Sequence, residues 1–252
     1  MSDLLFDDVT IRFGTHRKAF TAVNGVTLAV PSGTVVGLVG ESGSGKSTLA
    51  RAAVGLIKPA SGRILLDGRP LPKQPRLQMV FQDPYSSLDP RMTIGASVAE
   101  ALPRNDFPRW RAGTRDALRS EVARLLELVD LPADRADRYP AHLSGGQRQR
   151  VAVARALAGR PAVLIADEIT SALDVSIQGT VLNLVRRLQE LMHLTILFIS
   201  HDLAVVRYVS DTVAVMHDGL IVESGPTDAI LHDPQHPYTR RLLAAARTPM
   251  TT

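Results

Sequence analysis

Cysteine is absent from this sequence of 252 residues. Without thiols, the chain forms no disulfide and holds no zinc–thiolate site or cysteine-ligated iron–sulfur cluster. Long apolar runs are missing as well, because no stretch approaches the roughly 20 apolar residues of a membrane-spanning helix. The first residues are acidic where a secretory signal carries basic residues followed by a long apolar run. We therefore expect a chain that does not cross a membrane by itself.

A strong charge of either sign is also missing. The 29 Lys and Arg residues stand against 25 Asp and Glu residues, which leaves a formal net charge of only +4. Nucleic-acid-binding domains concentrate basic residues on one face, so we expect no nucleic-acid partner. Apolar residues make up 45% of the chain and charged residues 21%, which is the balance of a folded globular protein.

The N-terminal part alternates in the manner of β-strands and then leads into a helix. Apolar and polar residues alternate in Leu4–Phe13 and Ala22–Val30, which predicts two half-buried strands. Val35–Val39 is a short continuous apolar run of the kind found in buried parallel strands. A glycine-rich segment follows, and Ser47–Ile57 has helical spacing. Strand, glycine loop and helix in this order predict an α/β nucleotide-binding core.

From about Pro84 onward the pattern becomes helical. Thr93–Leu102 and Thr114–Val129 are amphipathic, and they predict a helical subdomain over residues 85–149. The α/β pattern resumes after it, so residues 1–84 and 150–252 are expected to form the core of a single domain. The other elements expected are helix Gln147–Ala158, strand Ala162–Ala166, helix Ile177–Met192, strand Thr195–Ser200, a hairpin of Val213–His217 and Leu220–Glu223 with a primed turn, and helix Tyr238–Arg247.

Residues 40–47 match the phosphate-binding pattern G-x-x-x-x-G-K-[ST] in full, between a predicted strand and a predicted helix. Such glycines let backbone N–H groups surround phosphate oxygens, and the helix start adds its positive dipole end. Lys46 can reach the β- and γ-phosphates, and the Ser47 hydroxyl can bind Mg²⁺. The expected nucleotide-contacting residues are Gly40, Glu41, Ser42, Gly43, Ser44, Gly45, Lys46, Ser47 and Thr48.

An acidic pair, Asp167 and Glu168, ends the apolar run that begins at Val163. By itself such a pair is also compatible with an ordinary loop start. A phosphate loop, however, requires a carboxylate for the metal and a group that activates water. We expect Asp167 to hold Mg²⁺ and Glu168 to act as the general base.

The segment Leu143–Gln147 precedes a predicted helix and has two interpretations. Ser144 and Gln147 have the S-x-x-Q spacing of a capping box, which satisfies free N–H groups at a helix start. Gly145 and Gly146 also allow close approach by another molecule, and a helix N-terminus attracts anions. The chain would then hold two phosphate-binding elements but only one phosphate loop. A dimer in which each nucleotide contacts both elements would account for this.

Taken together and in order, these segments resemble the ATPase subunits of ABC transporters over nearly the whole chain. The segments that carry the resemblance are Gly40–Ser47, Leu143–Gln147, Val163–Glu168, Ser171–Asp174 and His201. The resemblance implies an α/β P-loop NTPase of ABC type, with a mixed-sheet core, an N-terminal antiparallel β subdomain and an inserted α-helical subdomain. It also implies an ATPase that uses ATP and Mg²⁺. Two such domains would pair head to tail, with two ATP molecules between them.

Matching positions extend the resemblance to individual residues. The catalytic residues would be Glu168, His201, Lys46 and Gln82; the metal site would include Ser47, Gln82 and Asp167; and the opposite nucleotide would meet Ser144, Gly145, Gly146, Gln147 and Asp174. The aromatic residue that stacks on adenine is expected to be Phe13, with Phe20 as the alternative, because Gly14–Ala19 makes the match ambiguous. One departure is Ile169, where the family commonly has proline; we expect hydrolysis to survive it, with altered positioning of Glu168.

A narrower resemblance points to importers of the dipeptide, oligopeptide and nickel class. It rests on Phe81–Thr93, Ser171–Ser176 and His236–Arg240. It implies a cytoplasmic-face location, membrane permease subunits, an external solute-binding protein and a second ATPase, identical or different. Some relatives bind an iron–sulfur cluster through C-terminal cysteines, and this chain has no cysteine. The alternatives are an ABC exporter ATPase and, less favoured, a non-transport ABC ATPase acting on nucleic acid or ribosomes.

Overall fold

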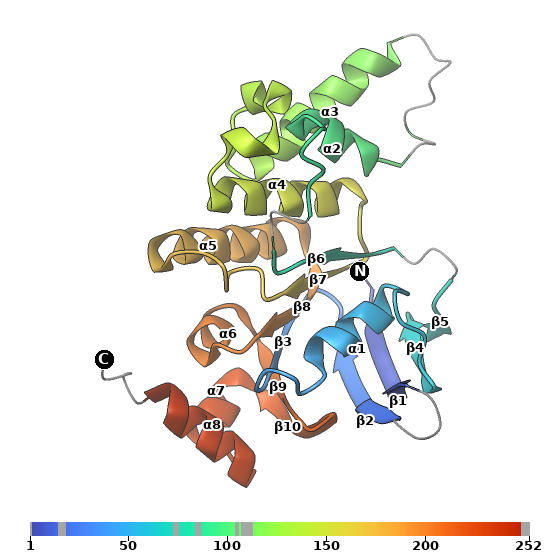
Figure 1. Ribbon diagram of the computed structural model, residues 1–252, viewed down its shortest axis with the longest axis vertical. Coiled ribbons are helices and arrows are strands. Elements are labelled where there is room, and N and C mark those ends of the chain that lie inside the picture. The colour runs from blue at the N-terminus through green and yellow to red at the C-terminus, as the bar shows by residue number, and fades with distance from the viewer. Residues whose placement is uncertain are drawn as a thin grey trace.

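A computed structural model describes residues 2–247 of the chain, except for residues 15–18, 73–75, 84–86, 104–105 and 107–112. Its elements form an antiparallel sheet, a mostly parallel sheet and a group of helices (Figure 1). This arrangement confirms the predicted fold class.

The first sheet contains the N-terminal strands. Its order is β2-β1-β4-β5, with bounds Leu4–Phe13 for β1, Phe20–Val30 for β2, Ser61–Leu66 for β4 and Arg69–Pro70 for β5. Strands β1 and β2 confirm the two that the alternating pattern predicted. Strands β4 and β5 were not predicted, because the apolar residues of β4 are confined to its last three positions, residues 64–66, and β5 consists of two exposed residues. In the β1–β2 register, Phe13 pairs with Phe20.

The second sheet has the order β10-β9-β3-β8-β7-β6. Its strands are β3 (Val35–Val39), β6 (Leu77–Val80), β7 (Val163–Asp167), β8 (Thr195–Ser200), β9 (Thr212–His217) and β10 (Leu220–Pro226). All neighbours are parallel except β10, which runs antiparallel to β9. Every residue of β3, β7 and β8 is buried, which explains their unbroken apolar runs.

The two faces of this sheet contribute residues to two different hydrophobic clusters. Along β3, Val36 and Leu38 pack with the antiparallel sheet and helix α1 (Lys46–Ala53), whereas Val35 and Val39 pack with the helices of the other face. The sheet is therefore a middle layer. Because the carboxyl ends of parallel strands meet at one edge, the loops after β3, β6, β7 and β8 emerge there together.

The central helices lie at one end of the molecule, away from the antiparallel sheet (Figure 1). Helices α2 (Ile94–Glu100), α3 (Thr114–Leu128) and α4 (Gly145–Ala158) pack against one another, and α4 also contacts β6 and α5. Each lies within two residues of its predicted range. The subdomain boundaries at 85 and 149 stay a prediction.

The C-terminal half adds α5 (Val175–Met192), α6 (Leu203–Val209), α7 (Thr227–His232) and α8 (Pro237–Arg247). Helices α6 and α7, of seven and six residues, were not predicted. The predicted hairpin turn is confirmed, since both Asp218 (φ 46°) and Gly219 (φ 79°) have the positive φ of a primed turn. Over the residues that the structure describes, no helix combines the length and apolar character needed to cross a bilayer.

Candidate active site

The loop between β3 and α1 is built on glycines that other residues could not replace. A Cβ atom on Gly40 would lie 2.1 Å from the carbonyl oxygen of Met216. Gly45 has φ 106°, and a Cβ atom there would lie 2.4 Å from the carbonyl oxygen of Ala22. Both ends of the loop therefore lie in close contact with the backbone of other strands. Its middle residues, Glu41, Ser42 and Gly43, are exposed.

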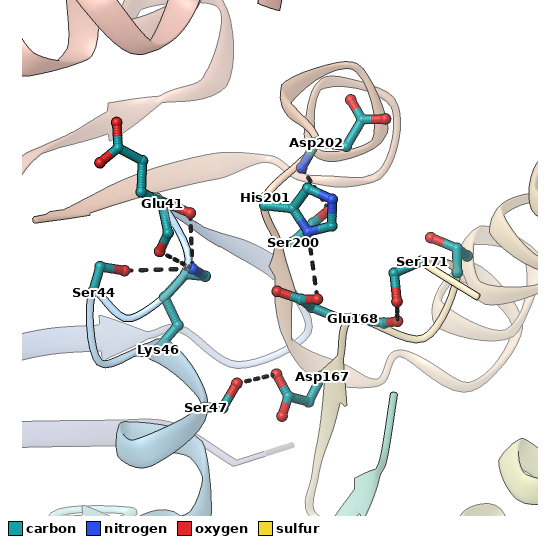
Figure 2. A network of polar contacts seen from close by, with 12 residues as sticks. Glu41, Ser44, Lys46, Ser47, Asp167, Glu168, Ser171, Ser200, His201 and Asp202 are labelled. Carbon is teal, nitrogen blue, oxygen red and sulfur yellow. Dashed lines mark hydrogen bonds and ion pairs between the residues drawn. The ribbon is translucent and has the colours of Figure 1, made fainter. Parts of the chain in front are cut away.

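Lys46 is the first residue of α1, and its side chain points back into this loop toward Glu41 and Ser44 (Figure 2). Its ammonium donates hydrogen bonds to the carbonyl oxygens of Gly40 (2.8 Å) and Glu41 (2.8 Å). The side chain is buried, and burial lowers the pKa of Lys46, a shift that the charges of Glu168 and Asp167 oppose. A buried cation with only neutral hydrogen-bond partners is stabilised by an anion. The loop therefore fits a phosphate group.

Ser47 and Asp167 face each other across the space between α1 and β7. The Ser47 hydroxyl donates to Asp167 Oδ1 at 2.9 Å. Burial raises the pKa of Asp167, and the hydrogen bond from Ser47 opposes that shift. A hydroxyl and a carboxylate are oxygen ligands of the kind that Mg²⁺ takes beside substrate phosphates. This pair fits a magnesium ion, although no group of three potential His, Asp or Glu ligands occurs among the described residues.

Glu168 and His201 follow adjacent strands and meet at the carboxyl edge of the sheet. His201 Nδ1 lies 3.4 Å from Glu168 Oε2, and the side chains are 56% and 16% exposed, respectively. Glu168 has φ 49°, a left-handed conformation that is unusual for a residue with a side chain. Such strain persists where surrounding contacts impose it, and it is concentrated at functional sites.

The backbone around Glu168 holds this conformation from both sides. Its N–H donates to the Ile199 carbonyl at 2.9 Å, and its carbonyl accepts from the Ser171 hydroxyl at 2.9 Å. The next residue, Ile169, is only 2% exposed and belongs to the hydrophobic core. Ile169 thus anchors the turn by packing. The expected survival of hydrolysis with Ile169 at this position stays a prediction.

The segment before α4 forms the predicted capping box. Ser144 Oγ accepts from Gln147 N at 3.3 Å, and Gln147 Oε1 accepts from Ser144 N at 3.0 Å. A Cβ atom on Gly146 would lie 2.4 Å from Ile177 Cγ2, whereas a Cβ atom on Gly145 would lie 3.4 Å from its nearest neighbour, Leu173 Cδ2. Packing of α4 on α5 therefore accounts for Gly146 without a ligand. The anion-binding role of this segment stays a prediction.

Within the part of the chain that the structure describes, the remaining predicted residues make no hydrogen bond to the phosphate loop, Asp167, Glu168 or His201. Gln82 is exposed directly after β6, and Asp174 is the exposed N-cap of α5. In Figure 1, strands β6 and β7 separate α4 from α1, and no hydrogen bond among the described residues joins the Ser144–Gln147 segment to the phosphate loop. One chain thus presents the two expected phosphate-binding elements at separate places.

Two further contacts of the phosphate loop were not predicted. The Tyr238 hydroxyl accepts a hydrogen bond from Glu41 N at 3.0 Å, and Gly219 N donates to the Ser44 carbonyl at 3.1 Å. Both come from the C-terminal region, and no local pattern connects them with the loop. The motif His236–Arg240, which contains Tyr238, was the available signal, although by itself it indicates only a transporter class.

Comparison with known proteins agrees with the family that the sequence motifs resemble. The family model described as "ABC transporter" matches residues 23–171, which is more than half of the chain. The probable peptide ABC transporter ATP-binding protein y4tS of Sinorhizobium fredii is 46% identical over 246 residues, covering 94% of this chain and 68% of that protein. The glutathione import ATP-binding protein GsiA of Salmonella typhimurium is 48% identical over 242 residues, covering 92% of this chain but only 38% of that protein.

Solved structures agree in fold. The dimeric post-hydrolysis ATP-binding cassette MJ0796, bound to ADP and Pi, superposes with a TM-score of 0.75 at 28% identity, over 89% of this chain and 98% of that one. The cbiO1 protein of Clostridium perfringens, part of an ABC transporter complex, superposes with a TM-score of 0.78 at 27% identity, over 91% of this chain and 90% of that one. With the phosphate loop, acidic pair and histidine assembled at one sheet edge, the chain belongs to the ABC transporter family and is an ATPase.

Proposed function

We propose that this chain is the ATP-hydrolysing subunit of an ABC importer for peptides or related small solutes, nickel among them, at the cytoplasmic face of the membrane. The observation that carries hydrolysis is the Glu168–His201 pair beside Lys46 and the Ser47–Asp167 pair. The direction of transport rests on the relatives, whose names describe peptide and glutathione import.

Binding of ATP is assigned to the phosphate loop. Lys46 would donate to phosphate oxygens while it keeps its carbonyl partners, which relieves the cost of its buried charge. Ser47 and Asp167, with Gln82 as a further ligand, would hold Mg²⁺. When bound, the ion neutralises phosphate charge that develops during transfer.

Hydrolysis is assigned to the carboxylate of Glu168. As a general base it would take a proton from the attacking water, with no covalent enzyme intermediate. His201, at 3.4 Å, would hold the Glu168 side chain toward the phosphate and contact the γ-phosphate itself. The left-handed backbone of Glu168 supports this assignment, because it fixes the direction in which the carboxylate leaves the strand.

A second ATPase subunit, identical or different, would complete each site. The residues supplied across the interface would be Ser144, Gly145, Gly146 and Gln147, with Asp174 linking the two sites. The separation of the two phosphate-binding elements within one chain supports a head-to-tail pair, and a related cassette is described as dimeric with ADP and Pi bound. ATP would then lie between the subunits.

Permease subunits would dock beside Gln82. A groove of about 680 Å³ lies there, between β6 and helices α2 and α4, and its lining includes Phe81, Glu100 and Arg155. Closure of the dimer on ATP would move the helices that form one wall of this groove. That movement would be passed to the membrane subunits, which select the solute together with an external binding protein.

Copurification tests this function. The tagged chain is extracted from membranes of its own cells in mild detergent, and its partners are identified by mass spectrometry. We expect integral membrane subunits, and a solute-binding protein encoded with them that binds peptide. Membrane subunits without any binding protein would favour export, and nucleic acid or ribosomes without membrane subunits would exclude transport.

The adenine contact gives a separate prediction. Phe13 and Phe20 are register partners, so their side chains lie on the same face of the hairpin, 43% and 62% exposed, respectively. Phe13→Ala is expected to weaken ATP binding by about tenfold through lost stacking, and Phe20→Ala by less than about twofold. Titration with ATP and Mg²⁺ by calorimetry measures both. A larger loss in Phe20→Ala would transfer the role to that residue.

A further inference from the structure

Helix α8 reaches the phosphate loop through one side chain. Tyr238 is the second residue of this helix, is 3% exposed, and lies 197 positions along the chain from Glu41. Its hydroxyl accepts the hydrogen bond of Glu41 N at 3.0 Å. Burial raises the pKa of Tyr238, so the hydroxyl stays neutral at physiological pH. The established activity assigns no task to this contact.

The hydrogen bond acts on the peptide unit that joins Gly40 to Glu41. In a planar trans peptide, the N–H and the C=O point in opposite directions. The N–H of this unit points to Tyr238, and its C=O, from Gly40, accepts from Lys46 Nζ at 2.8 Å. By accepting the N–H, Tyr238 therefore fixes the orientation of the Gly40–Glu41 peptide in which the Gly40 carbonyl points toward Lys46.

Tyr238 is itself held in place by the β9–β10 hairpin. Its ring stacks on His217, with centroids 3.8 Å apart and planes 17° from parallel. Its backbone N–H donates to His236 Nδ1 at 3.2 Å. The carboxylate of Glu223, on β10, accepts from Gln235 N (2.7 Å) and His236 N (3.1 Å), which anchors the start of α8. These contacts engage His236 and Tyr238, two residues of the motif His236–Arg240.

The same hairpin holds the other side of the loop. Gly219, in the turn, donates its N–H to the Ser44 carbonyl at 3.1 Å and accepts from Asn24 N at 2.8 Å. The loop is therefore supported at Glu41 and at Ser44 by one structural unit, α8 with the hairpin. Support at two points limits the rotation of the peptides between them.

We propose that Tyr238 is a positioning residue for ATP binding, which orients the Gly40–Glu41 peptide and through it Lys46. This proposal rests on the assignment of residues 40–47 as the phosphate site. Without the hydroxyl, Glu41 N loses its acceptor and the peptide is free to rotate. ATP must then order the loop as it binds, and the ordering reduces its affinity.

The test compares two Tyr→Phe variants of the full chain. Tyr238→Phe removes the hydroxyl but keeps the ring on His217. The matched control is Tyr208→Phe, because the Tyr208 hydroxyl bonds Asn183 on the exposed surface of α5 and α6. Tyr238→Phe is expected to raise the dissociation constant of a non-hydrolysable ATP analogue by about fivefold. Its kcat at saturating ATP should stay within about twofold, and Tyr208→Phe should change neither value.

Separate outcomes distinguish the positioning role from the site assignment. A dissociation constant in Tyr238→Phe equal to that of Tyr208→Phe would overturn the positioning role, even if both variants melt at a lower temperature. The variant Lys46→Ala serves as the reference. If it loses ATP while Tyr238→Phe binds normally, only the role of Tyr238 is wrong. If Lys46→Ala binds ATP normally, the phosphate site is wrong and this proposal fails with it.

Discussion

Glu168→Gln is expected to lower the rate of ATP hydrolysis by about a hundred- to ten-thousand-fold, which is the range of a lost general base. Glutamine has the size of glutamate and can occupy the same position near His201, but its neutral amide cannot take a proton from water. ATP binding should be retained, because Lys46, Ser47 and Asp167 are unchanged. The bound nucleotide would then stay uncleaved and hold two subunits together.

Three measurements check this result: steady-state phosphate release, ATP affinity, and particle mass by light scattering with and without ATP. The matched control is Glu190→Gln, an exposed glutamate on α5, which should hydrolyse ATP at the original rate. Turnover by Glu168→Gln at the unmodified rate would exclude Glu168 as the base. Failure of the variant to dimerise with ATP would argue against the head-to-tail pair.

Lys46→Ala is expected to weaken ATP binding by about a hundredfold, since a charge-assisted contact to phosphate is lost. The variant should still fold. Its substitution leaves the carbonyls of Gly40 and Glu41 without their donor, but it also removes a cation whose pKa is lowered by burial. These two effects on the free energy of unfolding oppose each other, so the loss in ATP binding should far exceed the loss in stability.

Calorimetric titration with ATP and Mg²⁺, together with thermal melting without nucleotide, separates the two effects. Lys58→Ala is the matched control, because Lys58 is exposed shortly after the end of α1. It should bind ATP normally. ATP affinity in Lys46→Ala close to that of the control would exclude the loop at residues 40–47 as the phosphate site.

Local patterns were sufficient for much of the fold and for the centre of the site. The run Val35–Val39, the glycine loop and the first turn of α1 follow one another, so adjacent residues are enough to identify the phosphate loop. The capping box at Ser144 is also local, since it joins residues only three positions apart. Long strands and helices were predicted for the same reason, because their apolar period repeats many times.

Weak or short patterns were missed. Strands β4 and β6 and helices α6 and α7 span four to seven residues, and each packs against neighbouring elements that are distant in the sequence or were not predicted. The interpretation of Gly146 also changed with the tertiary structure. A Cβ atom on Gly146 would collide with Ile177 of the neighbouring helix, which is a packing reason for glycine that the sequence did not reveal, and the ligand-binding role stays a prediction.

By itself, the sequence determined the order of the motifs, the families they resemble and the absence of any thiol chemistry, because these depend only on which residues are present and how they are spaced. The tertiary structure decided which of them meet. Glu168 faces His201 because β7 and β8 are neighbours in the sheet, and Tyr238 reaches Glu41 because α8 packs beside the β9–β10 hairpin. Contacts between residues so far apart depend on strand order and helix packing, which no local spacing encodes.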